Sequence, residues 1–148
     1  MTDFVGMSAL GPDRLIRGSH LLRCTRPHAF SRGSLPTMAD CLFCSIVSGD
    51  VPATKVYEND DVVSFVDVNP QAPTHLLVVP RKHVPDLAEL GADPRTAAAL
   101  VAGIRAVAAD KGITDFRTVF NTGAGAQQTV FHVHAHLLAG RPFNWPPG

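Results

Sequence analysis

The 148-residue sequence contains few cysteines and no long apolar segment. Its 3 cysteines, Cys24, Cys41 and Cys44, are too few and odd in number to suggest a disulfide framework, which favours a reducing, cytoplasmic location. The longest stretch without a strongly polar residue lies around residues 97–104 and is much shorter than the ~20 residues that a membrane span requires. We therefore expect no association with a membrane.

The sequence also lacks an excess of charge of either sign, since 13 Lys and Arg balance 13 Asp and Glu. Residues 1–37 carry five arginines against Asp3 and Asp13, whereas residues 38–148 carry eight basic and eleven acidic residues. A mildly acidic body without a basic face argues against a nucleic-acid partner. No magnesium-binding motif and no internal repeat is visible.

The chain divides into two regions by composition. Residues 1–37 are rich in Gly, Pro, Ser and Arg, show no sustained apolar period, and lack the apolar core of a secretory signal. We interpret them as a disordered extension or as the product of a start codon assigned too far upstream, because patterned sequence begins at Met38; an Arg-rich transit peptide is the alternative. Residues 38–148 are expected to form one globular domain.

The pattern of residues 40–148 predicts an α+β domain with a mostly antiparallel sheet, because strands follow one another in hairpin-like succession. A short helix from Leu42 ends at Gly49, and a longer helix starts at the N-cap Asp93 and ends near Gly112. Its apolar stripe comprises Leu100, Val101, Ile104, Val107 and Ala108. Strands are expected near residues 54–58, 61–67, 74–80, 116–121 and 129–138, and the third is apolar enough to be buried on both faces.

Three histidines alternate along the last predicted strand. His132, His134 and His136 would share one face, because successive side chains of a strand point to opposite faces. At a rise of about 3.3 Å per residue, the first and third would lie ~13 Å apart, too far to bind one ion at about 2 Å. A single three-histidine zinc site is thereby excluded, and we expect the three side chains to have different roles. Three surface histidines without a function are the alternative.

Cys41 and Cys44 are separated by two residues, a spacing that places two thiolates on one turn for zinc. His83 and one histidine of the alternating row are candidates for the remaining ligands. Two buried core cysteines and a redox dithiol are the alternatives.

The segment "NTGAGAQQT" precedes the histidine row and supplies backbone N–H groups that can face an anion. Asn121, Gln127, Gln128 and Thr129 add side-chain donors. Most Gly-rich segments between strands are only turns, but beside a row of imidazoles this one suggests a bound phosphate.

Taken together, these motifs resemble the histidine triad (HIT) family. His132 to Leu138 fits its alternation of histidine and hydrophobic residues, and the ending "WPPG" is similar to the Hint branch, the purine nucleoside phosphoramidases. The stretches "FVDVNPQAPTHLLVVPRKH" and "NTGAGAQQTVFHVHAHLLAGRPFNWPPG" are similar to the family's other signatures, so the resemblance covers most of residues 40–148. It implies a HIT-like fold with five strands, a short N-terminal helix and one longer helix, and a sheet continued across a homodimer.

The resemblance also implies an activity, the hydrolysis of purine nucleoside 5'-phosphoramidates and related AMP or GMP conjugates through a nucleotidyl-histidine intermediate. His134 matches the nucleophile, His136 lies by the phosphate and leaving group, and His75 is a further active-site histidine. A neutral imidazole can attack phosphorus near pH 7 while a protonated neighbour donates to the leaving group. Dinucleoside polyphosphate hydrolysis, and a nucleotide-binding scaffold with incidental hydrolysis, are the alternatives.

The same resemblance assigns the binding residues. The purine pocket matches Leu42, Phe43, Ile46, Phe65 and Val68; Asp67 matches the ribose ligand; and Asn121, Gln128 and Thr129 match positions near the phosphate. Without the resemblance, the apolar members would be assigned to the core and Asp67 to a turn cap.

Cys41, Cys44, His83 and His132 match the ligands of a structural zinc found in many bacterial members. Trp145 is expected to be a dimer or specificity element, and no role is assigned to Asn144 before it.

Overall fold

The structure is a computed structural model that describes residues 41–146, so the interpretation of residues 1–37 lies outside the described residues. The elements in chain order are α1 (Leu42–Ser48), β1 (Lys55–Glu58), β2 (Val62–Val66), β3 (Thr74–Pro80), α2 (Leu87–Leu90), α3 (Pro94–Asp110), β4 (Phe116–Val119), the 3-10 turn η2 (Ala124–Ala126) and β5 (Ala135–Ala139). None of the helices between residues 41 and 146 is long and apolar enough to cross a membrane.

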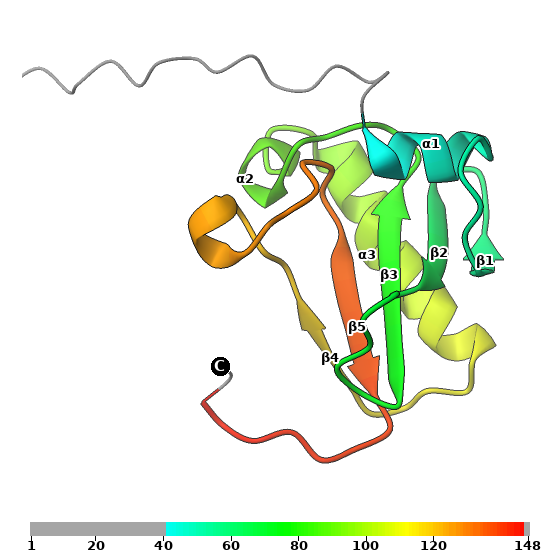
Figure 1. Ribbon diagram of the computed structural model, residues 1–148, viewed down its shortest axis with the longest axis vertical. Coiled ribbons are helices and arrows are strands. Elements are labelled where there is room, and N and C mark those ends of the chain that lie inside the picture. The colour runs from blue at the N-terminus through cyan, green and yellow to red at the C-terminus, as the bar shows by residue number, and fades with distance from the viewer. Residues whose placement is uncertain (1–40, 147–148) are drawn as a thin grey trace, which may run out of the picture. The chain divides into compact units, whose positions relative to one another are not determined.

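The five strands form one sheet in the order β1-β2-β3-β5-β4, with every neighbouring pair antiparallel. The chain builds β1, β2 and β3 as a meander, passes through α3, and returns with β4 and β5 (Figure 1). This architecture confirms the predicted α+β fold. The central strand β3 is buried from His75 to Pro80, as its nearly continuous apolar sequence predicted.

Each face of the sheet packs against a different helix. The long helix α3 covers one face, where Leu100, Ile104 and Val107 contact the sheet core. The short helix α1 lies on the other face (Figure 1). Its Phe43 and Ile46 pack against the sheet. Sheet residues of this second core are Val63, Phe65, Leu77 and Val79.

One residue of the predicted apolar stripe of α3 faces solvent. Val101 is 65% exposed, whereas its neighbour Leu100 is buried. Consecutive helical residues are separated by about 100° around the axis, so Val101 lies at the edge of the stripe.

Local signals account for the helix ends. The carboxylate of Asp93 accepts a hydrogen bond from the backbone N–H of Thr96, and α1 ends at Gly49 in the left-handed conformation with φ of 93°. The short helix α2 was not predicted, although the side chain of Asp86 caps it by accepting from the N–H of Glu89. The sequence Asp-x-x-Glu is an N-cap signal that could have revealed it.

The prediction of a strand over residues 129–138 was wrong at its start, since β5 begins only at Ala135. The ladder between β4 and β5 ends at the pair of Val119 and His136, so the preceding residues have no strand neighbour on that side. Instead, the N–H of Val133 donates to the backbone oxygen of Val84 in the loop after β3. His132 and His134 therefore lie on an irregular segment before the strand.

The alternation of side chains nevertheless persists through this segment. Val133, Ala135 and Leu137 belong to the core beneath α3. The rings of His132 and His134 both contact Phe43 of α1, on the opposite side of the sheet. The expected separation of a histidine side from an apolar side is therefore confirmed.

Candidate active site and metal site

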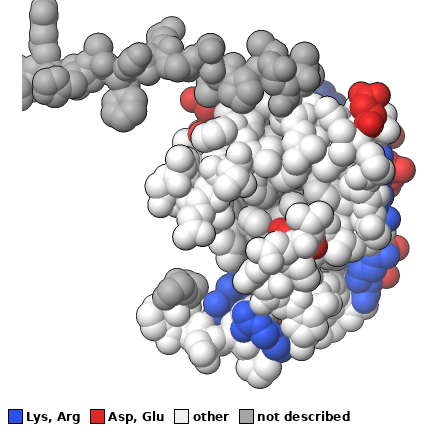
Figure 2. Space-filling model, viewed as in Figure 1, with Lys and Arg blue, Asp and Glu red and all other residues white. Residues whose placement is uncertain are grey.

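A cavity of about 610 Å³ opens on the side of the sheet that carries α1. Cavities of this size, on the order of 300–1,000 Å³, accommodate small-molecule ligands. Of the residues expected to bind a nucleotide, those lining the cavity are Leu42, Phe43, Ile46, Phe65, Asp67, Val68, Thr129, His134 and His136. Figure 2 shows that charged side chains are sparse over most of this face of the molecule.

The walls of the cavity are mainly apolar. Phe43 forms edge contacts with Phe65 and with His134, with ring centroids 5.4 Å and 5.1 Å apart. Leu42 and Val68 are exposed at the rim, Val68 completely. An apolar slot next to a histidine pair suits a flat, largely apolar group joined to a polar one.

Part of the cavity lining was not predicted from the sequence. The additional residues are Val51, Pro52, Ala53, Thr54, Val66, Leu77 and Val130. Leu77 could have been found, since strand alternation places it on the same face of β3 as the other members of the second core. Residues 51–54, which connect α1 to β1, carry no sequence pattern that predicts a place in the cavity wall.

His134 is held in one orientation by the backbone. Its Nδ1–H donates to the backbone oxygen of His132 at 2.7 Å, so in the neutral ring the lone pair lies on Nε2. Burial lowers the pKa of His134 below 6.5, and the hydrogen bond to His132 and the charge of Asp67 oppose this shift. His134 is therefore an uncharged nitrogen base at neutral pH.

Backbone contacts also set the proton positions of His75 and His136. The N–H of Gln71 donates to Nδ1 of His75 at 3.1 Å, which places the proton of the neutral His75 ring on Nε2. That Nε2–H lies 2.8 Å from Nδ1 of His136 and 3.3 Å from Oδ2 of Asp67. Since His136 accepts at Nδ1, its own proton lies on Nε2.

Nε2 of His136 is buried and has no hydrogen-bond partner among the described residues. Burial, with smaller contributions from His134 and His75, lowers the pKa of His136 to about 4. The expectation of a protonated neighbour beside the nucleophile is thus corrected, because the ring is neutral at pH 7. The group that His136 offers at the cavity is a neutral N–H donor.

Asp67, His75 and His136 also lie close enough together to suggest a metal site, with ligand atoms within 4.8 Å of one another. A metal ion would require a lone pair on Nε2 of His75. The Gln71 N–H at Nδ1 places a proton on that nitrogen, so the group is better described as a hydrogen-bonded relay.

Of the three residues predicted near the phosphate, two lie outside the cavity lining. Gln128 is buried, its Oε1 accepts from the N–H of Gly123, and its Nε2 donates to the backbone oxygens of Pro85 and Val130. Asn121 and Gln128 do not line the cavity, whereas Thr129 does. In this structure Gln128 holds the loop that presents Thr129.

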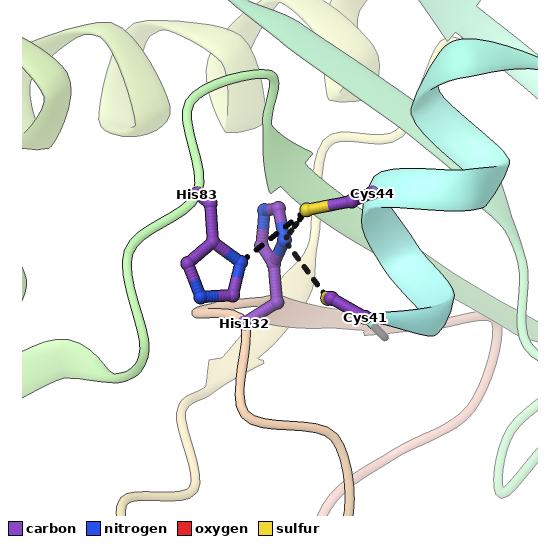
Figure 3. A group of neighbouring side chains, drawn as sticks. All are labelled: Cys41, Cys44, His83 and His132. Atoms are coloured by element: carbon purple, nitrogen blue, oxygen red, sulfur yellow. Dashed lines mark hydrogen bonds between the residues drawn. The ribbon is translucent and has the colours of Figure 1, made fainter. Parts of the chain in front are cut away.

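The structure brings Cys41, Cys44, His83 and His132 together from three separate parts of the chain (Figure 3). Cys41 is the N-cap residue of α1 and Cys44 lies in its first turn, while the histidines come from the loops after β3 and before β5. Nδ1 of His132 lies 3.6 Å from Sγ of Cys41 and 3.5 Å from Sγ of Cys44, and Nδ1 of His83 lies 3.3 Å from Sγ of Cys44.

These separations match a zinc site. On a tetrahedral zinc ion, a sulfur at about 2.3 Å and a nitrogen at about 2.1 Å lie about 3.6 Å apart. Nε2–H of His132 donates to the backbone oxygen of Pro80 at 2.9 Å, which leaves the Nδ1 lone pair facing the sulfurs. Zinc-binding histidines are commonly oriented in this way by a carbonyl.

The protonation states of the cluster also fit a metal ligand set. Burial is the main cause that lowers the pKa of His132 to about 4, so this ring is neutral and can coordinate. Burial, reinforced by Cys41, raises the pKa of the Cys44 thiol to about 11. The Cys44 thiol therefore keeps its proton at neutral pH unless a cation such as zinc displaces it.

The C-terminal segment packs against β4. The guanidinium groups of Arg117 and Arg141 lie 4.9 Å and 4.3 Å from the ring centroid of Phe143, and Arg117 donates to the backbone oxygen of Asn144. Trp145 follows and is 84% exposed.

The chain thus combines a five-stranded antiparallel sheet with His134 and His136 beside an apolar cavity and with a cluster of two cysteines and two histidines. The sequence profile of the HIT domain matches residues 48–143, and the chain belongs to the HIT domain family. It is 50% identical over 111 residues to an uncharacterized HIT-like protein from Synechocystis, a match that covers 74% of this chain and 97% of the relative. It is 40% identical over 111 residues to a 14 kDa zinc-binding protein from Zea mays, covering 72% and 87% of the two chains.

Solved structures agree with this assignment. A HIT family hydrolase from Legionella pneumophila superposes with a TM-score of 0.69 at 41% identity, covering 73% of this chain and 99% of its own. A histidine triad protein from Clostridium difficile gives a TM-score of 0.68 at 41% identity, with 74% and 97% covered. The fold and the family predicted from the sequence are confirmed.

Proposed function

We propose that this protein is a nucleotide hydrolase that cleaves purine nucleoside 5'-phosphoramidates and related AMP or GMP conjugates through a nucleotidyl intermediate on His134. The observation that carries the proposal is the hydrogen bond from Nδ1–H of His134 to the backbone oxygen of His132, which leaves an unprotonated Nε2 at the cavity. The similarity to a solved HIT family hydrolase supports the assignment to hydrolases.

In this proposal the nucleoside occupies the apolar slot. The purine packs between Phe43 of α1 and the aliphatic side chains, which include Leu42, Ile46 and Val68. The carboxylate of Asp67 accepts hydrogen bonds from the ribose hydroxyls. The hydroxyl of Thr129 and nearby backbone N–H groups donate to the phosphoryl oxygens, where fixed donors stabilise the charge that develops during transfer.

The first step is attack by Nε2 of His134 on the α-phosphorus. The new P–N bond forms as the bond to the leaving group breaks, and the leaving amine takes the proton from Nε2 of His136. The nucleotidyl-His134 ring then carries a positive charge, and the His75–His136 pair stays one proton short until the second step returns the proton. His75 donates to Nδ1 of His136 and so keeps that proton on Nε2 before the step. In the second step, water attacks phosphorus and its proton passes to His136, the bond to His134 breaks, and the nucleoside monophosphate is released.

We also propose a structural zinc ion held by Cys41, Cys44, His83 and His132. The zinc-binding relative from Zea mays and the tetrahedral ligand separations support it. Bound zinc would hold α1 against the loops before β5 and after β3. It would take no part at the phosphorus.

The proposal includes a cytoplasmic homodimer with no nucleic-acid or membrane partner. The edge strand β4 would extend the sheet into a second subunit, since among residues 41–146 it pairs only with β5. The exposed Trp145 next to this edge would serve as a contact or specificity element.

A panel of AMP conjugates that differ in their leaving group tests the function. We expect the fastest turnover with adenosine phosphoramidate and loss of turnover in His134→Ala. Faster cleavage of diadenosine polyphosphate would instead assign the protein to dinucleoside polyphosphate hydrolysis. Tight AMP binding with turnover near background would assign it to nucleotide-binding scaffolds.

A further inference from the structure

The four-residue metal site and the cavity share the helix α1. Cys41 and Cys44 face the two histidines of the metal site, while Leu42, Phe43 and Ile46 from the same helix line the cavity. The helix has only 7 residues, and the side chain of its N-cap residue accepts no capping hydrogen bond from the helix backbone. Helices this short are marginal without tertiary contacts. The position of α1 therefore depends on its tertiary contacts, which are the packing of Phe43 and Ile46 against the sheet and the contacts of its two cysteines.

The metal site and the proposed nucleophile share a second residue, His132. Its Nδ1 faces the two sulfurs, its Nε2–H donates to the backbone oxygen of Pro80, and its own backbone oxygen accepts the Nδ1–H of His134. The ring of Phe43 bridges the two histidines, with centroids 6.1 Å from His132 and 5.1 Å from His134. A displacement of His132 would therefore move the acceptor that keeps the lone pair of His134 on Nε2.

The rest of the fold does not depend on the metal site. The core beneath α3 joins the sheet to the long helix and contains none of its four residues. Cys41 belongs only to the smaller core on the α1 face. Loss of the metal should loosen α1 and the segment before β5 and leave the sheet folded.

We infer that metal binding at Cys41, Cys44, His83 and His132 is positively coupled to nucleotide binding in the cavity. His132 is the positioning residue that connects them. The inference rests on the proposed function in taking the cavity as the nucleotide site and the four residues as the metal site. Coupling between two binding sites is reciprocal, so a nucleotide must raise the metal affinity by the factor by which the metal raises the nucleotide affinity.

The test uses the full chain, with zinc as the metal and AMP as the nucleotide probe. The affinity for AMP is measured by calorimetry on zinc-loaded and chelator-treated protein, and the affinity for zinc by competition with a chromophoric chelator, with and without saturating AMP. We expect both affinities to change by the same factor, about 5- to 150-fold. Cys44→Ser should bind AMP as weakly as metal-free wild type and should not respond to zinc. Cys24→Ser, which replaces a cysteine outside the set of four, should behave as wild type.

A second readout follows the His134 ring directly. Nitrogen-15 NMR should place the proton on Nδ1 in the zinc-loaded protein and show a mixture of tautomers in the metal-free protein, while circular dichroism shows the sheet retained. Equal AMP affinity with and without zinc would overturn the coupling and leave the proposed function intact. An unchanged His134 tautomer would overturn the role of His132, and a metal-free chain that unfolds completely would overturn a local coupling. AMP binding in neither form would instead refute the nucleotide site itself.

Discussion

Nδ1 of His134 lies 2.7 Å from the backbone oxygen of His132, the residue whose side chain forms part of the cysteine–histidine cluster. Two histidines separated by one residue thus have different tasks. The first fixes a backbone acceptor by anchoring its ring at the cluster and at Pro80. The second uses that acceptor to present Nε2 to the cavity.

The relay from His75 to His136 should affect the chemical step more than binding. We expect His136→Ala to lower kcat by about 10²- to 10⁴-fold, the usual contribution of a positioned proton donor. His75→Ala should lower kcat less, because His136 remains but can place its proton on either nitrogen. Steady-state kinetics with adenosine phosphoramidate measure both variants.

A leaving group that needs no proton provides the control for this prediction. An AMP conjugate whose leaving group is a weakly basic phenolate needs no proton donor, so both variants should recover most of the lost rate on it. Equal losses on the phenol and amine substrates would show that His136 is not the proton donor.

The dependence of kcat/KM on pH should reflect the lowered histidine pKa values. Burial lowers the pKa of His134 below 6.5 and that of His136 to about 4. A lowered pKa keeps the imidazole neutral to more acid pH, so the decline of kcat/KM on the acid side should have its midpoint below pH 6.5. Because kcat/KM reports the free enzyme, a profile on adenosine phosphoramidate tests this directly. A decline that is half complete at pH 7 would contradict the buried, neutral arrangement.

Gly103 of α3 marks the closest approach between the helix and the sheet. A Cβ atom at this position would lie 2.7 Å and 2.8 Å from the two γ-carbons of Val62, a buried residue of β2. Gly103→Ala should therefore lower the free energy of unfolding by about 1–3 kcal/mol, although the same change at an open helical site stabilises. Urea denaturation measures the effect.

Two further variants test whether the effect of Gly103→Ala comes from its contact with Val62. Val101→Ala on the same helix replaces a side chain that is 65% exposed and should change stability by about 0.5 kcal/mol or less. In a Val62→Ala background, where both γ-carbons are absent, Gly103→Ala should lower the free energy of unfolding by less than it does in the wild-type protein. A stabilising Gly103→Ala would mean that α3 can move away from the sheet.

The elements with strong local signals were predictable from sequence. The helix α3 has an Asp93 cap and a regular apolar stripe, and β3 has an unbroken apolar run. The start of β5 was not predictable, because the alternating residues before it are typical of a strand. The N–H of Val133 instead donates to the backbone oxygen of Val84, which is distant in the sequence. Periodicity reports which side a residue faces, and it does not report which partner is available.

The candidate site was predictable only in parts. Spacing alone paired Cys41 with Cys44 and separated the roles of the three histidines. His83 and one histidine of the row were candidates from their chemistry alone, but the choice of His132 came from the family resemblance, because the contacts span 39 and 88–91 residues along the chain. The proton positions of His75 and His136 depend on a backbone N–H of Gln71, which no sequence pattern reveals.

The central claim is that His134 forms a covalent bond to phosphorus, and trapping that intermediate tests it most directly. Excess protein is mixed with adenosine phosphoramidate, quenched with base within one turnover because the P–N bond is labile in acid, and analysed by peptide mass spectrometry. The account predicts an adenylyl group on the peptide that contains His134 and none in His134→Ala. Two results would contradict it. One is that the wild-type protein consumes adenosine phosphoramidate with no adduct at any time within the turnover, and the other is that an adduct persists in His134→Ala.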